Sequence, residues 1–219
     1  YNYSNDNGSI RYRYIKKVAG NIDGKEYYDI ASFRGTGGPI VEYVREGLEN
    51  EFMKKFNEAF DKYCLEQNII AEFAKIDPWS DYHKLVEREC NAEYYGNFYC
   101  NDLTENFFEQ TYNRNAKRAI KKAVNGGVEV LIDNKGDTID DFVRLYQNTE
   151  IKYNTGDYYN FDRKDIKKYF DELGKDAFLI DAVLNGEIIT SVLVVCGKDV
   201  MHYYLLGNNT LFLNLQCNS

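Results

Sequence analysis

The sequence has few of the residue types from which metal sites, catalytic triads and disulfide frameworks are built. Its 219 residues include two histidines, and its five cysteines are scattered, with no C-x-x-C pair. This cysteine pattern disfavours a zinc site and a disulfide framework, and it predicts reduced cysteines in a cytoplasmic protein. So few histidines also disfavour a zinc enzyme or a triad hydrolase. We therefore expect no metal cofactor.

Long apolar runs are missing as well. The longest, such as Val192–Cys196, cover only a few residues, whereas a membrane helix needs about 20. The N-terminal residues show no basic segment followed by an apolar one, which a secretory signal would require. The sequence thus predicts a cytoplasmic protein without a membrane span.

Acidic residues outnumber basic ones, 35 to 27, which gives a formal net charge of −8. A negative charge of this size disfavours general, sequence-blind binding to nucleic acid. One short segment departs from this balance, because residues 114–123 carry five cations, namely Arg114, Lys117, Arg118, Lys121 and Lys122.

On a helix these five cations would share one broad side. The opposite side would be apolar and would dock the helix on its domain, with Ala116, Ile120, Ala123 and Val124. Two interpretations of the cations stay open. They form a solvated helix face, or they bind an anionic partner, with Arg114 and Arg118 one turn apart gripping phosphate oxygens.

Apolar periodicity in the first half of the chain predicts strands at 9–19, 25–33 and 68–76. It also predicts a loop at 34–39 and a helix at 45–67 with an aromatic stripe. A short helix near 81–89 and a strand near 94–100 are also expected.

In the second half, segments with the two-residue apolar period of a strand alternate more clearly with segments that have the period of a helix. This pattern predicts a helix at 104–125 capped by Thr104, and a strand at 128–133. Two helices follow, one from Asp137 or Thr138 and one capped by Asp162 with Ile166, Tyr169, Phe170 and Leu173 facing inward. Strands at 177–184, 187–196 and 200–207 then form an antiparallel meander, because Asn185-Gly186 is a strong hairpin signal.

This order, with four local motifs, resembles the GNAT acyltransferases and in particular the Fem-type peptidoglycan aminoacyltransferases. The motifs are NAKRAIKKAVNGGVEV, FVRLYQNTEIKYN, YYDIASFRGTGGPI and NIIAEFAKIDP. The resemblance implies an α/β fold with a mixed sheet, in two related GNAT-like domains at 1–103 and 104–219. It also implies that both domains are incomplete, the second without its donor helix and last strand. We therefore expect this chain to bind acyl-CoA weakly or not at all.

The resemblance suggests two sets of anion-binding residues. Arg34, Gly35, Gly37 and Gly38 match a pyrophosphate-binding loop, although Pro39 departs from the family pattern; the alternative is a tight turn. Lys75 and Lys152 stand where relatives often have arginine and could hold an acidic substrate. The alternative for each is a solvated lysine.

Three further residues are candidates for contact with the acceptor. Tyr158 and Tyr204 could stack on a sugar or a peptide, or they could pack in a core. His202 could be the general base that takes the proton of an acceptor amine, or it could be a structural histidine.

The function implied is transfer of an acyl or aminoacyl group to an amine of a cell-wall or surface-glycan precursor. The donor would be an acyl-CoA or an aminoacyl-tRNA. The acceptor would be an anionic small molecule or a lipid-linked glycan precursor, and tRNA is a further candidate partner. The alternative is a non-catalytic domain of the same fold that binds or scaffolds.

Overall fold

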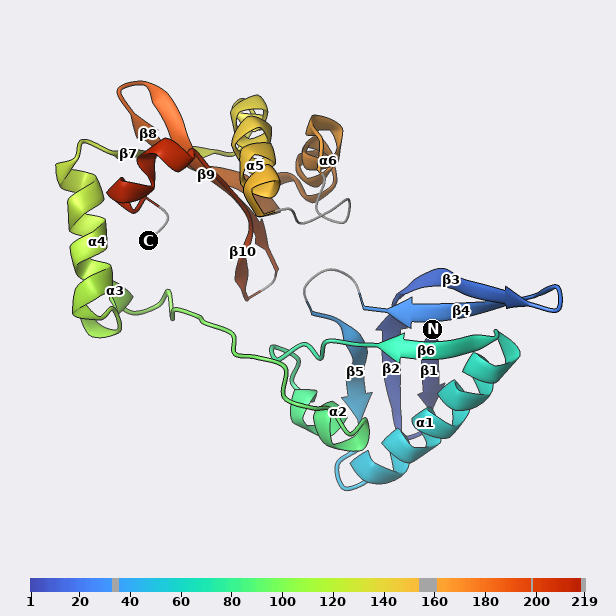
Figure 1. The fold of residues 1–219 in the computed structure, drawn as a ribbon. Helices are drawn as coiled ribbons and strands as arrows, with labels where there is room; N and C mark the ends of the chain where they lie inside the picture. Colours follow the sequence, from blue (N-terminus) through green and yellow to red (C-terminus); the bar gives the residue numbers. More distant parts are fainter. Residues whose placement is uncertain (33–35, 154–160, 198, 218–219) are drawn as a thin grey trace. The chain divides into compact units, whose positions relative to one another are not determined.

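In the computed structural model, the chain divides into two compact units, Tyr1–Phe98 and Tyr99–Ser219 (Figure 1). The structure describes residues 1–32, 36–153, 161–197 and 199–217, and the side chains of these except 150–153. Both units combine helices with sheets, so the expectation of a mixed α/β chain is confirmed at that level. That the two units share a related fold, and that this fold is GNAT-like, stay predictions.

The described residues of unit 1 form two sheets and two helices. One sheet has the order β1-β2-β5, with β1 (Asn2–Asn5), β2 (Gly8–Arg13) and β5 (Gly38–Val44). The other has the order β3-β4-β6, with β3 (Ile15–Ile22), β4 (Lys25–Ala31) and β6 (Ile69–Phe73). The helices are α1 (Glu49–Glu66) and α2 (His83–Glu89). The pair β4–β6 is parallel, and the other pairs are antiparallel.

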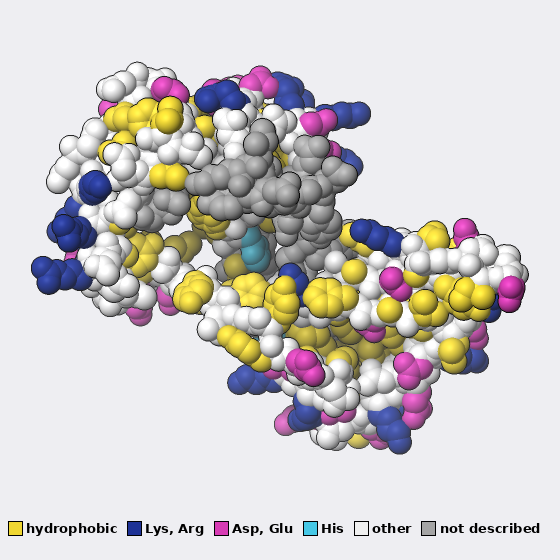
Figure 2. All heavy atoms as spheres, in the orientation of Figure 1, with side chains coloured by type: hydrophobic (Ala, Val, Ile, Leu, Met, Phe, Trp, Pro, Cys, Tyr) yellow, Lys and Arg dark blue, Asp and Glu magenta, His cyan; other side chains and the backbone are white. Residues whose placement is uncertain are grey.

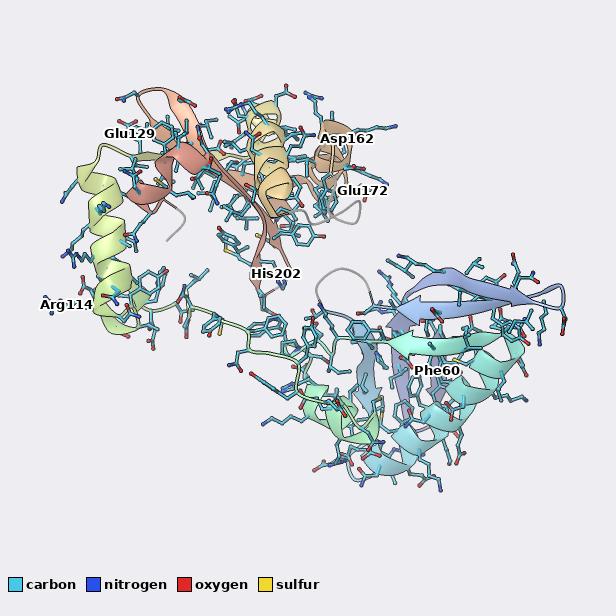
Figure 3. The ribbon with its side chains drawn as sticks, in the orientation of Figure 1. Phe60, Arg114, Glu129, Asp162, Glu172 and His202 are labelled. Carbon is cyan, nitrogen blue, oxygen red and sulfur yellow. The ribbon has the colours of Figure 1, made fainter. Side chains whose placement is uncertain are left out.

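The aromatic stripe predicted for α1 forms the centre of the unit 1 core. Phe52, Phe56 and Phe60 are buried, with Phe56 and Phe60 stacked at 5.7 Å between ring centres (Figure 3). They pack with Ile10 and Tyr12 of β2 in one apolar cluster. Large aromatic rings at three- and four-residue steps thus hold the helix on the strands through buried area.

Three expectations for unit 1 are wrong. The single strand at 9–19 is two strands in different sheets, because the alternation of buried and exposed residues ends at Tyr14 and residues 16–19 are all exposed. No strand forms at 94–100, where Tyr94 and Tyr99 are exposed. Aromatic residues favour strands only where a neighbouring strand pairs with them. The loop predicted at 34–39 ends early, because β5 begins at Gly38.

Unit 2 is built on one four-stranded sheet with the order β10-β9-β8-β7. These strands are β7 (Glu129–Asp133), β8 (Ala177–Leu184), β9 (Glu187–Cys196) and β10 (Met201–Asn208). Every neighbouring pair is antiparallel, so the predicted meander of the last three strands is confirmed. Positive φ at Asn185 and Gly186 makes the expected hairpin turn.

The helices of unit 2 are α3 (Phe107–Gln110), α4 (Arg114–Asn125), α5 (Ile139–Tyr153) and α6 (Arg163–Leu173), with 3₁₀ turns η2 (Gly174–Asp176) and η3 (Thr210–Leu215). The core joins α5, α6 and the sheet through Phe142, Ile166, Leu179 and Leu193. Asp162 caps α6, as predicted, in a capping box with Asp165.

Expectations for two of the unit 2 helices, α4 and α6, are wrong in part. The helix expected at 104–125 begins at Arg114, because the Asn113 side chain accepts the Ala116 N–H and caps it there. Thr104 therefore caps no helix. Leu173, expected to face inward, is 38% exposed at the end of α6. Among the described residues, none of the helices has both the length and the apolar character needed to cross a membrane.

Candidate functional site

β10 carries an irregularity beside two of the predicted site residues. Within the described part of the chain it is an edge strand, paired with β9 alone. Its ladder shifts between Tyr203, opposite Val194, and Leu205, opposite Leu193. Tyr204 is therefore the extra residue of a β-bulge, and a bulge takes main-chain groups out of the ladder.

His202 and Tyr204 lie on the same face of β10. His202 pairs with Val195, whose side chain packs against the core formed with α5 and α6. Directly paired residues project to the same face of a sheet. Tyr204 packs against that same core, and its hydroxyl accepts a hydrogen bond from the Tyr169 hydroxyl at 3.1 Å. His202 itself is exposed, near the start of β10 (Figure 3).

This arrangement combines two groups that acyl transfer uses. An exposed imidazole can accept the proton of an attacking amine. Main-chain N–H groups released at a bulge can donate to the oxyanion that develops on an acyl carbonyl. The Tyr169 contact fixes the Tyr204 ring beside both groups.

Unit 1 brings together Gly37, Gly38 and Lys75. Gly37 forms a parallel bridge with Ile76, and its N–H donates to the Lys75 carbonyl at 2.7 Å. Gly38 has φ +80°, and a Cβ there would lie 3.4 Å from the Ile76 side chain. The Gly37 N–H is therefore bonded within the fold and does not face a phosphate. Arg34 and Gly35 lie outside the described residues.

The Lys75 side chain is directed over an aromatic ring. Its Nζ lies 4.9 Å from the ring centre of Tyr95, and Tyr95 meets Phe73 edge-on at 6.4 Å. Tyr95 is 77% exposed, so its ring is open to a ligand, while Lys75 is half-buried beside it. The side chain of Lys152 and the whole of Tyr158 lie outside the described part of the chain.

Two of the five cations of α4 are engaged within unit 2. Lys117 Nζ donates to the Glu109 carbonyl at 2.8 Å and lies 3.3 Å from the Glu109 carboxylate. Lys122 Nζ donates to the Asn214 carbonyl in η3 at 2.6 Å. These bonds tie α4 to α3 on one side and to η3 on the other.

The other three cations, Arg114, Arg118 and Lys121, form what we call the cationic stripe. They are exposed, and within the described residues they make no hydrogen bond or ion pair. The opposite face is buried through Ala119 and Ala123. The amphipathic helix predicted from the sequence is confirmed. The prediction that Val124 lies on its docking face is wrong, because Val124 is 64% exposed.

Sequence reasoning missed a buried polar group that joins β7, α5 and β8. Asp133, at the end of β7, accepts the N–H groups of Lys135, Gly136 and Thr138 at 2.8–2.9 Å. It also accepts the Thr138 hydroxyl at 2.9 Å. The signal was present in the sequence, because an aspartate followed closely by Gly136 and Thr138 is typical of a side-chain turn that starts a helix.

Thr138 connects this carboxylate to a second one. Its hydroxyl oxygen lies 2.7 Å from Asp181 Oδ2, and Asp181 is 0% exposed. One hydroxyl hydrogen cannot serve two carboxylates at once, so Thr138 can donate either to Asp133 or to Asp181. Burial raises the pKa of Asp181, and the nearby Asp133 charge adds to this, while the hydroxyls of Ser191 and Thr138 oppose it.

The pKa of Asp133 is shifted the other way. Burial alone would raise it, but the hydrogen bonds from Thr138 and the Lys135 N–H outweigh burial and hold the pKa below its usual value. Asp133 therefore stabilises the fold above the unfolded-state pKa of about 3.9, and this contribution is lost as the pH falls through the folded-state value. Asp181 lowers stability as the pH rises from about 3.9 towards its own raised pKa.

We expect Asp181→Asn and Asp133→Asn to show opposite pH profiles. Below about pH 3, Asp181→Asn should match the wild type, because Asp181 is then protonated in both the folded and unfolded states. Towards neutral pH it should become the more stable protein, while Asp133→Asn becomes the less stable one. Urea unfolding across this range measures both differences, and parallel profiles for the two variants would contradict the assignment.

Within the described residues, no group of three or more His, Cys, Asp or Glu side chains could hold a metal ion. Whether the protein uses a metal stays a prediction from the sequence. Comparison of this chain with protein-family models and with curated proteins finds no match.

Proposed function

We propose that this chain is an acyltransferase of the GNAT or Fem type. It transfers an acyl or aminoacyl group to an amine of a cell-wall or surface-glycan precursor. The observation that carries the proposal is the bulge at Tyr204 in edge strand β10, next to the exposed His202. The antiparallel order β7-β8-β9-β10, with α5 and α6 between the first two strands, supports it as well.

The residues of β10 would assist each bond change. The acceptor amine attacks the carbonyl carbon of the donor, and His202 takes the proton that the nitrogen loses. Main-chain N–H groups at the bulge stabilise the oxyanion, and the bond from the carbonyl carbon to the thiol or hydroxyl leaving group then breaks. The leaving group takes up the proton, which balances the reaction without a metal. Acyl-CoA and aminoacyl-tRNA both supply such a leaving group.

The other candidate residues would bind the substrates. Lys75, beside the ring of Tyr95, fits an acidic acceptor that also carries a sugar or peptide. Arg114 and Arg118 fit the phosphates of an anionic precursor, such as a lipid-linked one held at a membrane. Lys152 and Tyr158 keep the substrate-binding roles that the family resemblance implies.

The chain's two histidines provide a matched test of the proposed base. We expect His202→Gln to lower the rate of acyl transfer by about 10²-fold or more, since a general base contributes that much. His83→Gln is the control, because His83 lies in α2, where its ring bonds to the Ser80 carbonyl. The assay supplies acetyl-CoA or aminoacyl-tRNA with an amine-bearing muropeptide precursor. Equal rates in the two variants would contradict a catalytic His202.

One observation favours the alternative of a non-catalytic binding domain. The Gly37 N–H is bonded to Lys75, so the glycine loop offers one main-chain donor fewer to a phosphate. A binding domain would bind the acceptor in calorimetry and show no turnover with either donor. Turnover with either donor would exclude it.

A further inference from the structure

α4 differs from the other long helices in how its charges are balanced. In α1, Lys55 pairs with Glu51 one turn away, and in α6, Lys167 pairs with Asp171. α4 has five cations and no acidic residue, in a chain whose acids outnumber its bases. If the only role of these side chains were to keep the helix surface soluble, there would be no need to separate basic residues from acidic ones in this way.

The cationic stripe is held in a fixed orientation. Its residues are spaced i, i+4 and i+7, so they follow one side of the helix over about two turns, or roughly 10 Å. Ala119 and Ala123 are buried on the opposite side. Figure 2 shows Lys and Arg side chains gathered along α4. Arg114 occupies the first turn, where the helix dipole disfavours a cation, so helix stability does not explain its position.

Exposed aliphatic side chains lie near the C-terminal end of the same helix. Val124 of α4 is 64% exposed, and Leu211 and Leu213 of η3 are 82% and 40% exposed. η3 touches this end of α4, because a Cβ at Gly126 would lie 3.4 Å from the Leu215 side chain. We call Val124, Leu211 and Leu213 the aliphatic rim.

We propose that the cationic stripe and the aliphatic rim dock this protein on a bilayer that contains anionic phospholipid. Lysine and arginine bind headgroup phosphates, while short apolar side chains enter the interface, which together are typical of peripheral membrane contacts. A surface for single-stranded nucleic acid would instead carry aromatic rings between its cations, and the exposed neighbours here are aliphatic. The inference goes beyond the proposed transferase activity and does not require it.

Cosedimentation with vesicles tests the stripe directly. We expect the protein to sediment with phosphatidylcholine vesicles that contain phosphatidylglycerol, and not with phosphatidylcholine alone. Arg114→Ala, Arg118→Ala and Lys121→Ala combined should weaken binding about 100-fold, since each cation contributes about fivefold. The control combines Lys62→Ala, Lys167→Ala and Lys168→Ala, which removes the same charge from residues paired with acids.

A second pair of variants tests the rim. Leu211→Ser with Leu213→Ser should weaken vesicle binding about tenfold, because less apolar surface is buried in the interface. Leu65→Ser with Val18→Ser is the control, since both are exposed apolar residues of unit 1. Circular dichroism checks that each variant is folded.

Three results would overturn the proposal. The wild type does not bind anionic vesicles, or the control triple variant loses as much binding as the stripe variant does. In the third, an RNA oligonucleotide binds through the stripe while anionic vesicles do not, which would assign the stripe to nucleic acid. None of these results depends on acyl transfer, so failure here is distinguishable from failure of the proposed activity.

Discussion

Gly207→Ala should destabilise unit 2 by about 3 kcal/mol or more, with unit 1 left folded. Gly207 lies on β10, where the strand passes directly under α5. An added Cβ would stand 2.5 Å from the Tyr146 main-chain N, and 2.8 Å from the carbonyl carbon and the Cβ of Leu145. The clash is mostly with helix backbone, which cannot rotate away as a side chain can. The methyl group must therefore push β10 and α5 apart and open the core between them.

Gly197→Ala is the matched control in the same unit. A Cβ there would meet only the Val200 carbonyl, at 3.6 Å, which is an ordinary contact. Urea unfolding followed by circular dichroism should separate the two alanine variants clearly. Equal stability would show that β10 does not approach α5 as closely as described, and the position of the bulge would then be in question.

Asp133→Ala is expected to cost unit 2 about 3 kcal/mol at neutral pH. The substitution leaves three N–H groups and the Thr138 hydroxyl without their acceptor. Hydrogen bonds to a charged group contribute about 1.5–3 kcal/mol each, and water recovers part of this at a partly accessible turn. The loss also frees the start of α5 from the end of β7.

Two further variants show whether the lost stability comes from the hydrogen bonds to Asp133. Asp133→Asn keeps one acceptor oxygen and should lose about half as much stability. Asp137→Ala removes an exposed aspartate from the same turn and should cost less than about 1 kcal/mol. Equal losses in all three variants, measured by urea unfolding, would mean that general charge near the helix start matters more than these hydrogen bonds.

Apolar periodicity and turn residues in the sequence predicted the elements that are determined by interactions within one helix or one turn. The stripe of Phe52, Phe56 and Phe60 placed α1, and Asn185-Gly186 placed the hairpin between β8 and β9. Each signal is contained within one helix or one turn, where side-chain period and backbone preference agree.

Pairing between distant segments was not predictable in the same way. β5 begins with Gly38 and Pro39, which usually interrupt a strand, yet it pairs with β2 as the outer strand of its sheet. Proline is tolerated there because an outer edge needs no N–H donor. The bulge at Tyr204 likewise depends on register with β9, and its own sequence gives no signal for it.

For the candidate site, the sequence predicts which residues take part, and the structure shows what surrounds each of them. His202 and Tyr204 were both named from the sequence, and the structure places them on one face of β10. The sequence predicts that the Gly37 N–H donates a hydrogen bond to a phosphate, and the structure shows this N–H bonded to the Lys75 carbonyl. The hydrogen-bond partner of a main-chain group depends on which distant segments pair in the fold, and the local sequence does not show this.

The central claim is that the main chain at the β10 bulge holds the acyl carbonyl of a donor. The measurement is ¹H–¹⁵N NMR of the labelled protein, titrated with acetyl-CoA and, separately, with an aminoacyl-adenosine analogue of the tRNA end. Free CoA is the control for binding without an acyl group. We predict that one of the two donors shifts the amide signals of Tyr204 and Leu205, acetyl-CoA only at high concentration because we expect this chain to bind it weakly. Free CoA should not shift them, and Leu131 on the opposite edge strand should stay unchanged. If neither donor moves these two amides, or if Leu131 moves equally, the account is contradicted.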